Sequence, residues 1–143
     1  MTIDQILKEK GAGVTTVTDT QTLHSVAKVL DEARIGAVVA IGTDGKVTGV
    51  LSERDIVRQL ARHGAGAMTM TVAAAMTRDV ITATPQETVD HCMELMTDRR
   101  IRHLPILKDG GLAGLISIGD LVKWKIAATE AEAEAMKSYI ATG

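Results

Sequence analysis

Two segments of this chain repeat one pattern, and the repetition constrains the fold more than any other feature of the sequence. Residues 49–57 read Gly-Val-Leu-Ser-Glu-Arg-Asp-Ile-Val, and residues 114–122 read Gly-Leu-Ile-Ser-Ile-Gly-Asp-Leu-Val. Both contain Gly, two aliphatic residues, Ser, two variable residues, Asp, an aliphatic residue and Val, in that order. The sequence therefore predicts one structural unit that occurs twice.

Each copy of the pattern indicates a strand that leads directly into a helix. A short aliphatic run after Gly is typical of the end of a buried strand. Ser is a favoured N-cap, and Asp three residues later completes a capping-box-like pair at the positive end of the helix dipole. A single Ser-x-x-Asp would indicate helix capping alone. Two copies within longer matching segments favour a repeated site for an anion or a polyhydroxyl ligand.

The remaining pattern predicts an α/β fold made of two β-α-β-β-α units. For the first unit we expect a strand at 14–17, a helix capped by Thr22 and ended near Gly36, strands at 37–41 and 47–51, and a helix at 53–63. For the second we expect a strand at 80–83, a helix capped by Thr88, strands at 103–107 and 112–116, and a helix from Ser117.

Three further segments complete the predicted organisation. Residues 2–10 form an amphipathic helix, Gly-Ala-Gly-Ala at 64–67 forms a flexible break, and the Ala- and Glu-rich residues 127–141 form a last helix. The chain then divides into a first repeat with its N-terminal helix (1–63), a linker with a short helix (64–79), a second repeat (80–126) and a C-terminal helix (127–143).

Composition limits the partners and the location of the protein. The formal net charge is −2 and no Lys/Arg-rich run occurs, so a nucleic-acid partner is not favoured. No apolar run is long enough to span a bilayer, and the N-terminus lacks a signal pattern, so we expect no membrane partner. The single cysteine, Cys92, is read as a buried small hydrophobe rather than a nucleophile. These features predict a cytoplasmic protein.

Sequence signatures of catalysis are missing. Neither Gly11-x-Gly13 nor Gly64-x-Gly66 has the third glycine of a dinucleotide fingerprint, and no Gly-Lys-Ser/Thr loop or nucleophile elbow occurs. His103 has no second ligand at metal-binding spacing. We therefore predict that the chain is not an enzyme and holds no catalytic cofactor or metal.

The doubled unit resembles the cystathionine-β-synthase-type (CBS) domain pair, also called a Bateman module. The most specific parts of the resemblance are the two Gly-x-x-Ser-x-x-Asp segments and Arg102-His103-Leu104-Pro105-Ile106. It covers the chain from the first helix to about Ile126. The resemblance implies two repeats about a pseudo-twofold axis, whose sheets form a cleft with two sites for adenine nucleotides. The implied ligand is AMP, ADP, ATP or NAD(H).

The same resemblance assigns roles to individual residues. Asp55 and Asp120 would accept hydrogen bonds from ribose hydroxyls, and Ser52 and Ser117 would lie beside the sugar or the phosphate. The other implied site residues are Thr16 and Thr82 on the first strands, Arg54 at a phosphate, and Arg102, His103 and Pro105 in the second repeat. Arg99, Arg100 and Arg102 form a candidate phosphate cluster, with a solvated helix end as the alternative.

The sequence thus predicts a regulatory sensor that binds an adenine nucleotide and acts through a ligand-biased conformation. An unidentified partner protein would bind according to that conformation. The resemblance also implies a homodimer, because members of the family often form dimers. We expect Asp120 to matter for binding at least as much as Asp55. The alternative is a structural or dimerisation module that has no nucleotide ligand.

Overall fold

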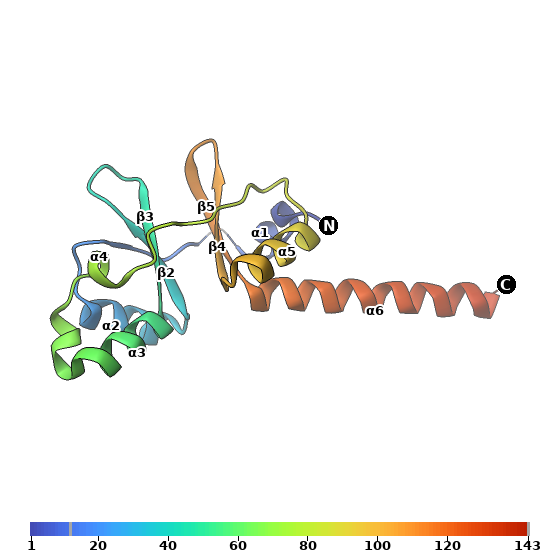
Figure 1. Cartoon of the computed structure of the whole chain (residues 1–143). Coiled ribbons are helices and arrows are strands. Elements are labelled where there is room, and N and C mark those ends of the chain that lie inside the picture. Colours follow the sequence, from blue (N-terminus) through green and yellow to red (C-terminus); the bar gives the residue numbers. More distant parts are fainter. Residues whose placement is uncertain (12, 143) are drawn as a thin grey trace.

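The computed structural model describes residues 1–11 and 13–142. Two units of sheet and helix lie side by side, and one long helix projects from the second unit (Figure 1). We call the units the first repeat, from β1 (Thr16–Thr18) to α3 (Glu53–His63), and the second repeat, from α5 (Val89–Arg99) to the start of α6 (Ile118–Thr142). The α/β fold with two repeats is the architecture that the sequence predicts.

The first repeat is a three-stranded sheet with helices on one face. Strand β1 (Thr16–Thr18) runs parallel to β2 (Ala37–Ile41), which pairs antiparallel with β3 (Val47–Ser52). Helices α2 (Leu23–Ala33) and α3 (Glu53–His63) pack on the sheet. The aliphatic core between these layers contains Val17, Leu23, Val26, Leu30, Val38, Ala40, Leu51 and Ile56.

The second repeat has the same layers with one strand fewer. Strands β4 (His103–Lys108) and β5 (Gly111–Ser117) pair antiparallel, and helices α5 (Val89–Arg99) and α6 (Ile118–Thr142) pack on them. The core contains Val89, Cys92, Met96, Leu104, Ile106, Ile116 and Leu121. Burial, reinforced by the charge of Glu87, raises the pKa of the Cys92 thiol to about 11, which keeps it protonated and unreactive at neutral pH.

The strand predicted at 80–83 is reduced to one bridge, in which Ala83 pairs parallel with Ile106. Proline explains the difference. In the first repeat, the Val39 amide donates to the Thr15 carbonyl at 3.3 Å and extends the ladder between β1 and β2. The second repeat has Pro105 at the position of Val39, and proline has no amide hydrogen to donate.

The helix α1 (Ile3–Lys10) precedes the first repeat in sequence but packs on the second. Ile3 and Ile6 are fully buried in the core of the second repeat. Backbone hydrogen bonds fix the attachment, because the Ile3 amide donates to the Glu87 carbonyl and the Val89 amide donates to the Met1 carbonyl. The sequence prediction grouped this helix with the first repeat, within residues 1–63, because it is next to that repeat in the chain. In the structure it packs on the second repeat.

The short helix α4 (Val72–Ala75) makes the reciprocal contact with the first repeat. Val72 and Met76 are buried in the first core. The Leu23 amide donates to the Met70 carbonyl, and Thr22 bridges Thr71 much as Thr88 bridges Thr2 in the other repeat. Each core is thus completed by a helix that lies just before the other repeat in the chain.

Some helix boundaries differ from the sequence prediction. Helix α2 ends at Ala33, and Arg34 adopts the left-handed conformation that caps it, two residues before the predicted Gly36. Arg100 caps α5 in the same way. The predicted flexible break at 64–67 lies within the 3-10 helix η1 (Gly64–Thr69), because Ala67 is fully buried and anchors it.

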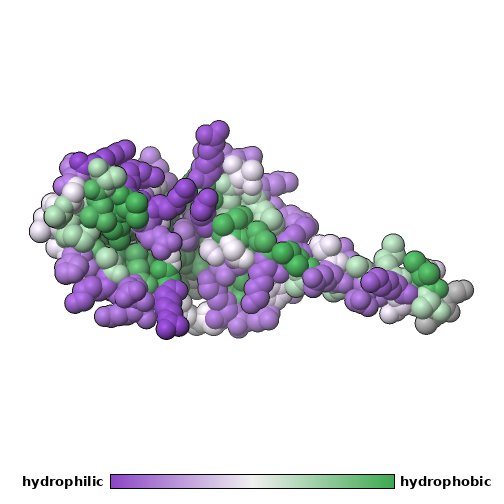
Figure 2. All heavy atoms as spheres, turned by 90° about the horizontal axis from the view of Figure 1, so that it is seen from below, coloured by the Kyte–Doolittle hydropathy of each residue, from purple (hydrophilic) through white to green (hydrophobic). Residues whose placement is uncertain are grey.

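Helix α6 continues unbroken through residues 118–142, across the division predicted at 126/127. Its outer part extends beyond the body of the protein, and apolar side chains gather near its far end (Figure 2). Neither this helix nor any other helix of the described residues combines the length and the apolar composition that a bilayer span requires.

Two equivalent glycines allow the exchanged helices to approach the sheets. A Cβ on Gly49 would lie 2.5 Å from the Met76 sulfur and 2.7 Å from the Thr77 carbonyl oxygen, whereas a Cβ on Gly114 would meet the end of the Leu7 side chain. A flexible leucine can move, but a backbone carbonyl cannot. We expect Gly49→Ala to cost about 2–3 kcal/mol of unfolding free energy and Gly114→Ala less. Urea denaturation of both variants checks this order, and equal costs would contradict it.

Candidate functional site

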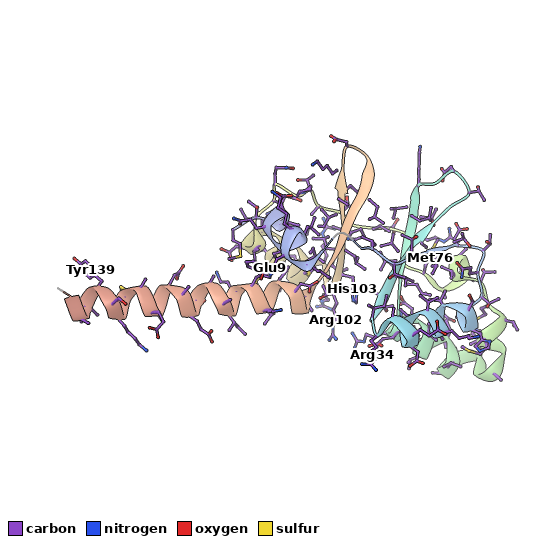
Figure 3. All side chains as sticks on the ribbon, turned by 180° about the vertical axis from the view of Figure 1, so that it is seen from behind. Glu9, Arg34, Met76, Arg102, His103 and Tyr139 are labelled. Carbon is purple, nitrogen blue, oxygen red and sulfur yellow. The ribbon has the colours of Figure 1, made fainter. Side chains whose placement is uncertain are left out.

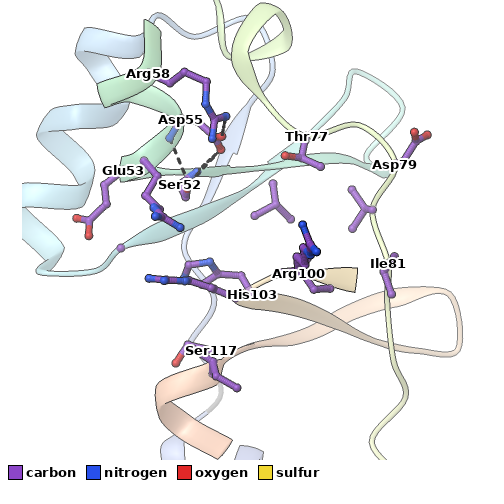
Figure 4. A pocket seen from close by; sticks show the side chains of 17 residues that line it. Ser52, Glu53, Asp55, Arg58, Thr77, Asp79, Ile81, Arg100, His103 and Ser117 are labelled. Carbon is purple, nitrogen blue, oxygen red and sulfur yellow. Dashed lines mark hydrogen bonds and ion pairs between the residues drawn. The ribbon is translucent and has the colours of Figure 1, made fainter. Parts of the chain in front are cut away.

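A cleft of about 630 Å³ lies where the two repeats meet. This is within the range of about 300–1,000 Å³ that small-molecule sites occupy. The labelled side chains of Arg34, Arg102 and His103 mark the junction of the two repeats (Figure 3). A close view shows the β3–α3 junction on one side, the start of β4 on the other, and the connecting segment 77–81 along the edge (Figure 4).

The first repeat presents a capping box to the cleft. The Ser52 hydroxyl accepts from the Asp55 amide at 3.3 Å, and the Asp55 carboxylate accepts from the Ser52 amide at 2.9 Å and the Ser52 hydroxyl at 3.1 Å. Arg58 donates to the second carboxylate oxygen at 3.1 Å. Three donors leave one of about four acceptor positions on Asp55. Asp55 is only 8% exposed, so its charge is fixed in place beside the cleft.

Three guanidinium groups line the cleft without a carboxylate partner among the described residues. They belong to Arg54 on α3, Arg100 at the end of α5, and Arg102 just before β4. Arginine binds carboxylates and phosphates through paired donors. The lining also contains the carboxylates of Glu53 and Asp79, so the cations are not matched by an equal number of free anions. The arrangement suits a ligand that brings its own negative charge.

His103 lies at the start of β4, half-buried in the same lining. Burial lowers the pKa of His103 from its ordinary 6.5, the Glu53 carboxylate partly opposes this, and Lys10 and Arg102 reinforce it. The imidazole is therefore mainly neutral at pH 7. An anion bound beside it would favour the protonated form.

The equivalent junction in the second repeat is arranged differently. Asp120 caps α6 with Ser117, whose amide donates to the carboxylate at 2.9 Å. Lys10 also donates to Asp120 at 2.7 Å and to the Leu115 carbonyl at 3.0 Å. Burial alone would raise the pKa of Asp120, but the hydrogen bonds and the charge of Lys10, together with Ser117, hold it below its usual value. Each capping carboxylate is thus paired with a cation of the chain, Asp55 with Arg58 and Asp120 with Lys10, but only Asp55 is among the residues that line the cleft.

The structure brings together most of the residues that the sequence suggested for the site. Six of them line the cleft, namely Ser52, Arg54, Asp55, Arg102, His103 and Ser117. Four do not: Thr16 is exposed on β1, Thr82 is exposed beside the bridge at Ala83, Pro105 is buried within β4, and Asp120 is paired with Lys10. Among the described residues, no group of His, Cys, Asp or Glu side chains suits a metal ion.

Sequence reasoning missed the connecting segment, which contributes Thr77, Asp79, Val80 and Ile81 to the lining. Thr77 is held against β3 by two backbone hydrogen bonds with Val50, so the chain after α4 must pass the cleft. No residue pattern in 77–81 predicts that this segment lines the cleft. The repeat gave only a weak indication of it, because a segment that connects two units sharing a site must cross their junction.

Comparisons with known proteins agree on one family. The CBS domain model matches residues 12–62 and 72–127. The chain is 33% identical to "CBS domain-containing protein CBSX3, mitochondrial" of Arabidopsis thaliana, over 99% of this chain and 73% of the plant protein.

Solved structures share the fold. A CBS-domain protein of Agrobacterium tumefaciens has a TM-score of 0.82 and 41% identity, covering 85% of this chain and 91% of its own. The AMP complex of a CBS domain protein from Pyrobaculum aerophilum has a TM-score of 0.75 and 27% identity, with coverage of 84% and 89%. The domain pair of protein MJ0100, in complex with 5-methylthioadenosine and S-adenosyl-L-methionine, has a TM-score of 0.79 and 25% identity, with coverage of 90% and 98%.

Proposed function

The chain belongs to the CBS-domain family, and on that basis we propose that it is a regulatory module that binds an adenosine ligand between its repeats and performs no catalysis. Structural neighbours in complex with AMP and with S-adenosyl-L-methionine and 5-methylthioadenosine support an adenosine ligand in general. The observation that carries the proposal is the cleft itself, which is lined by a fixed carboxylate, Asp55, and by three guanidinium groups that have no carboxylate partner among the described residues.

The charges of the cleft favour a ligand with phosphate over an uncharged or cationic adenosine derivative. Arg54, Arg100 and Arg102 offer paired N–H groups that can donate hydrogen bonds to a phosphate. Their positive charges would repel the positive charge of a sulfonium. AMP, ADP, ATP and NAD(H) carry such phosphates, whereas 5-methylthioadenosine has none. We therefore expect an adenine nucleotide to bind more tightly than 5-methylthioadenosine or S-adenosyl-L-methionine.

The ribose would bind at Asp55 rather than at Asp120. Asp55 borders the cleft, whereas Asp120 is not among the residues that line it. Each carboxylate already accepts from a cationic side chain, Asp55 from Arg58 and Asp120 from Lys10, so the position at the cleft decides between them. This reverses the ranking of the two carboxylates that the sequence suggested.

Regulation would follow from the position of the cleft. Ser52 and Asp55 belong to the first repeat, and Arg102 and His103 belong to the second. A ligand that contacts both repeats stabilises the arrangement in which those contacts are made, and a partner protein then reads that arrangement. The identity of this partner, the homodimer and the cytoplasmic location stay predictions from the sequence.

Ligand release and titration together test the proposed function. Mass spectrometry of small molecules released from denatured purified protein should detect an adenine nucleotide. Calorimetric titration of ligand-free protein with AMP should give saturable binding, without turnover of ATP or NAD(H) in long incubations. No released nucleotide and no heat with any adenosine ligand would favour the structural or dimerisation module instead.

Affinity for AMP should rise as the pH falls. The pKa of His103 lies below 6.5 in the free protein, and a bound phosphate would raise it, so binding takes up a proton. We expect the affinity to increase up to about tenfold between pH 7.5 and 6, because one unit of pKa shift corresponds to tenfold in binding.

Calorimetry across this pH range checks the expectation. His103→Gln should remove most of the pH dependence, and the residual dependence reports the titration of the AMP phosphate itself. An unchanged pH profile in His103→Gln would mean that His103 does not contact the phosphate.

A further inference from the structure

Among the described residues, the two cores contain no side chain from the outer part of α6. Residues 129–142 extend beyond the body of the protein, and Tyr139 lies near the end of the helix, far from the cleft (Figure 3). An isolated helix of this length is only marginally stable in water. A projecting helix that stays folded is therefore expected to pack against a partner surface. Its large apolar side chains are a second sign of such a partner, because they are exposed on a helix rich in Ala and Glu.

Four exposed apolar residues of α6 follow a heptad spacing, while a fifth, Tyr139, lies beside them at g. Val122, Ile126, Met136 and Ile140 are 40%, 54%, 64% and 74% exposed. Thr129 and Ala133 fall between them, so that the steps along the helix alternate between four and three residues. This is the a/d spacing of a coiled-coil seam, with Ile126, Ala133 and Ile140 at a and Val122, Thr129 and Met136 at d. The core-facing residues of the same helix, Leu121 and Trp124, lie outside the seam.

We propose that this seam, residues 122–140 of α6, binds the same seam of a second copy of the chain in a parallel two-stranded coiled coil. The seam is about 27 Å long at the rise of an α-helix. β-Branched residues at a favour two strands, and Ile occupies two of the three a positions. The proposal does not depend on the nucleotide function proposed above.

The flanking charges select a second copy as the occupant and the parallel orientation. In a parallel pair, each g residue faces the e residue five places later on the partner helix. Lys125 then meets Glu130 and Glu132 meets Lys137, both attractive pairs. An antiparallel pair would instead place Glu130 near Glu130 and Glu132 near Glu132 of the two copies, which repel.

Lys125 also has a partner within its own chain. Its ammonium lies 2.9 Å from the Asp90 carboxylate, and both side chains are at least half exposed. An exposed pair of this kind contributes little to stability, so Lys125 can exchange it for Glu130 of a second copy at small cost.

Sedimentation equilibrium of the full chain tests the seam. The wild type should approach twice the 15.2 kDa chain mass at micromolar concentration. Met136→Glu and Ile140→Glu should each weaken dimerisation at least tenfold, since each places a charge at a buried apolar contact. Both residues lie beyond the body, so the fold should persist in circular dichroism. The matched control Ala135→Glu, on the outer face at c, should leave the mass unchanged.

Charge exchange and cross-linking test the orientation. Glu132→Lys should weaken the dimer, and Glu132→Lys with Lys137→Glu should restore it. In the parallel coil, Ile140→Cys should cross-link to its copy under mild oxidation, with Cys92 buried and inert. A monomeric wild type, or a dimer that resists Met136→Glu and Ile140→Glu, would overturn the proposal. Val57 on α3 is an exposed apolar residue of the body, 63% exposed. A dimer lost only on Val57→Glu would assign the contact to the body instead.

Discussion

Asp55→Asn is expected to weaken AMP binding about ten- to a hundredfold, whereas Asp120→Asn should change it by less than about twofold. A hydrogen bond to a charged group contributes roughly 1.5–3 kcal/mol, and the carboxylate of Asp55 has one acceptor position left for a ribose hydroxyl. The amide of Asn retains one oxygen for the Ser52 amide but loses the charge and the second acceptor. Asp120 has the same sequence context, but it is not among the residues that line the cleft.

Binding and stability must be measured separately for these variants. Asp55 is buried and accepts three hydrogen bonds, so Asp55→Asn should also cost about 1–2 kcal/mol of unfolding free energy. Calorimetry with AMP and urea denaturation without ligand separate the two effects. If Asp55→Asn lowers the stability but leaves the affinity for AMP unchanged, Asp55 caps the helix and does not bind the ligand. Loss of affinity in Asp120→Asn instead would move the site to the second repeat.

Local chemistry made much of the fold predictable. The strand at 37–41 and the helix at 53–63 begin and end at the predicted residues, because each is set by neighbours along the chain: an aliphatic run, an Asp-Gly turn and a Ser cap. Thr22 and Thr88 cap α2 and α5 as predicted, each accepting from the amide three residues later. Capping is decided within one turn of helix, so the sequence contains all that it needs.

Features that depend on distant residues could not be predicted in this way. The strand at 80–83 looked as apolar as its counterpart, but its pairing failed at Pro105, on another strand. The exchange of α1 and α4 between the cores depends on space beside Gly114 and Gly49, which only the folded sheets define. Local periodicity identifies an amphipathic helix without identifying the core that it will join.

The candidate site shows the same division. The repeat located the two capping boxes, and Gly119 at the position of Arg54 already indicated that the two junctions differ, but it did not identify the side chains that distant elements bring to them. They differ because Lys10, at the end of α1, reaches Asp120, while Asp79 stands at the matching place after α4 and lines the open cleft. A cation in one place and an anion in the other make the two halves of a symmetric fold electrostatically unequal.

The reciprocal packing of α1 leads to the prediction with the largest effect on stability. Ile6 is 1% exposed and lies in the core of the second repeat. Ile6→Ala should cost about 2–5 kcal/mol of unfolding free energy, because the cavity it leaves is enclosed by α5 and the sheet. Backbone amides should lose protection against hydrogen exchange mainly in α5, β4 and β5, although Ile6 precedes the first repeat in the chain.

Val72→Ala is the matched control, since Val72 is equally buried in the other core and follows the first repeat in sequence. It should reduce protection mainly in α2, β2 and β3, and at a smaller total cost, because fewer methyl groups are removed. Protection lost equally from both repeats in both variants would indicate a single cooperative unit. Loss confined to the first repeat in Ile6→Ala would contradict the exchange of helices, and with it the position of Lys10 beside Asp120.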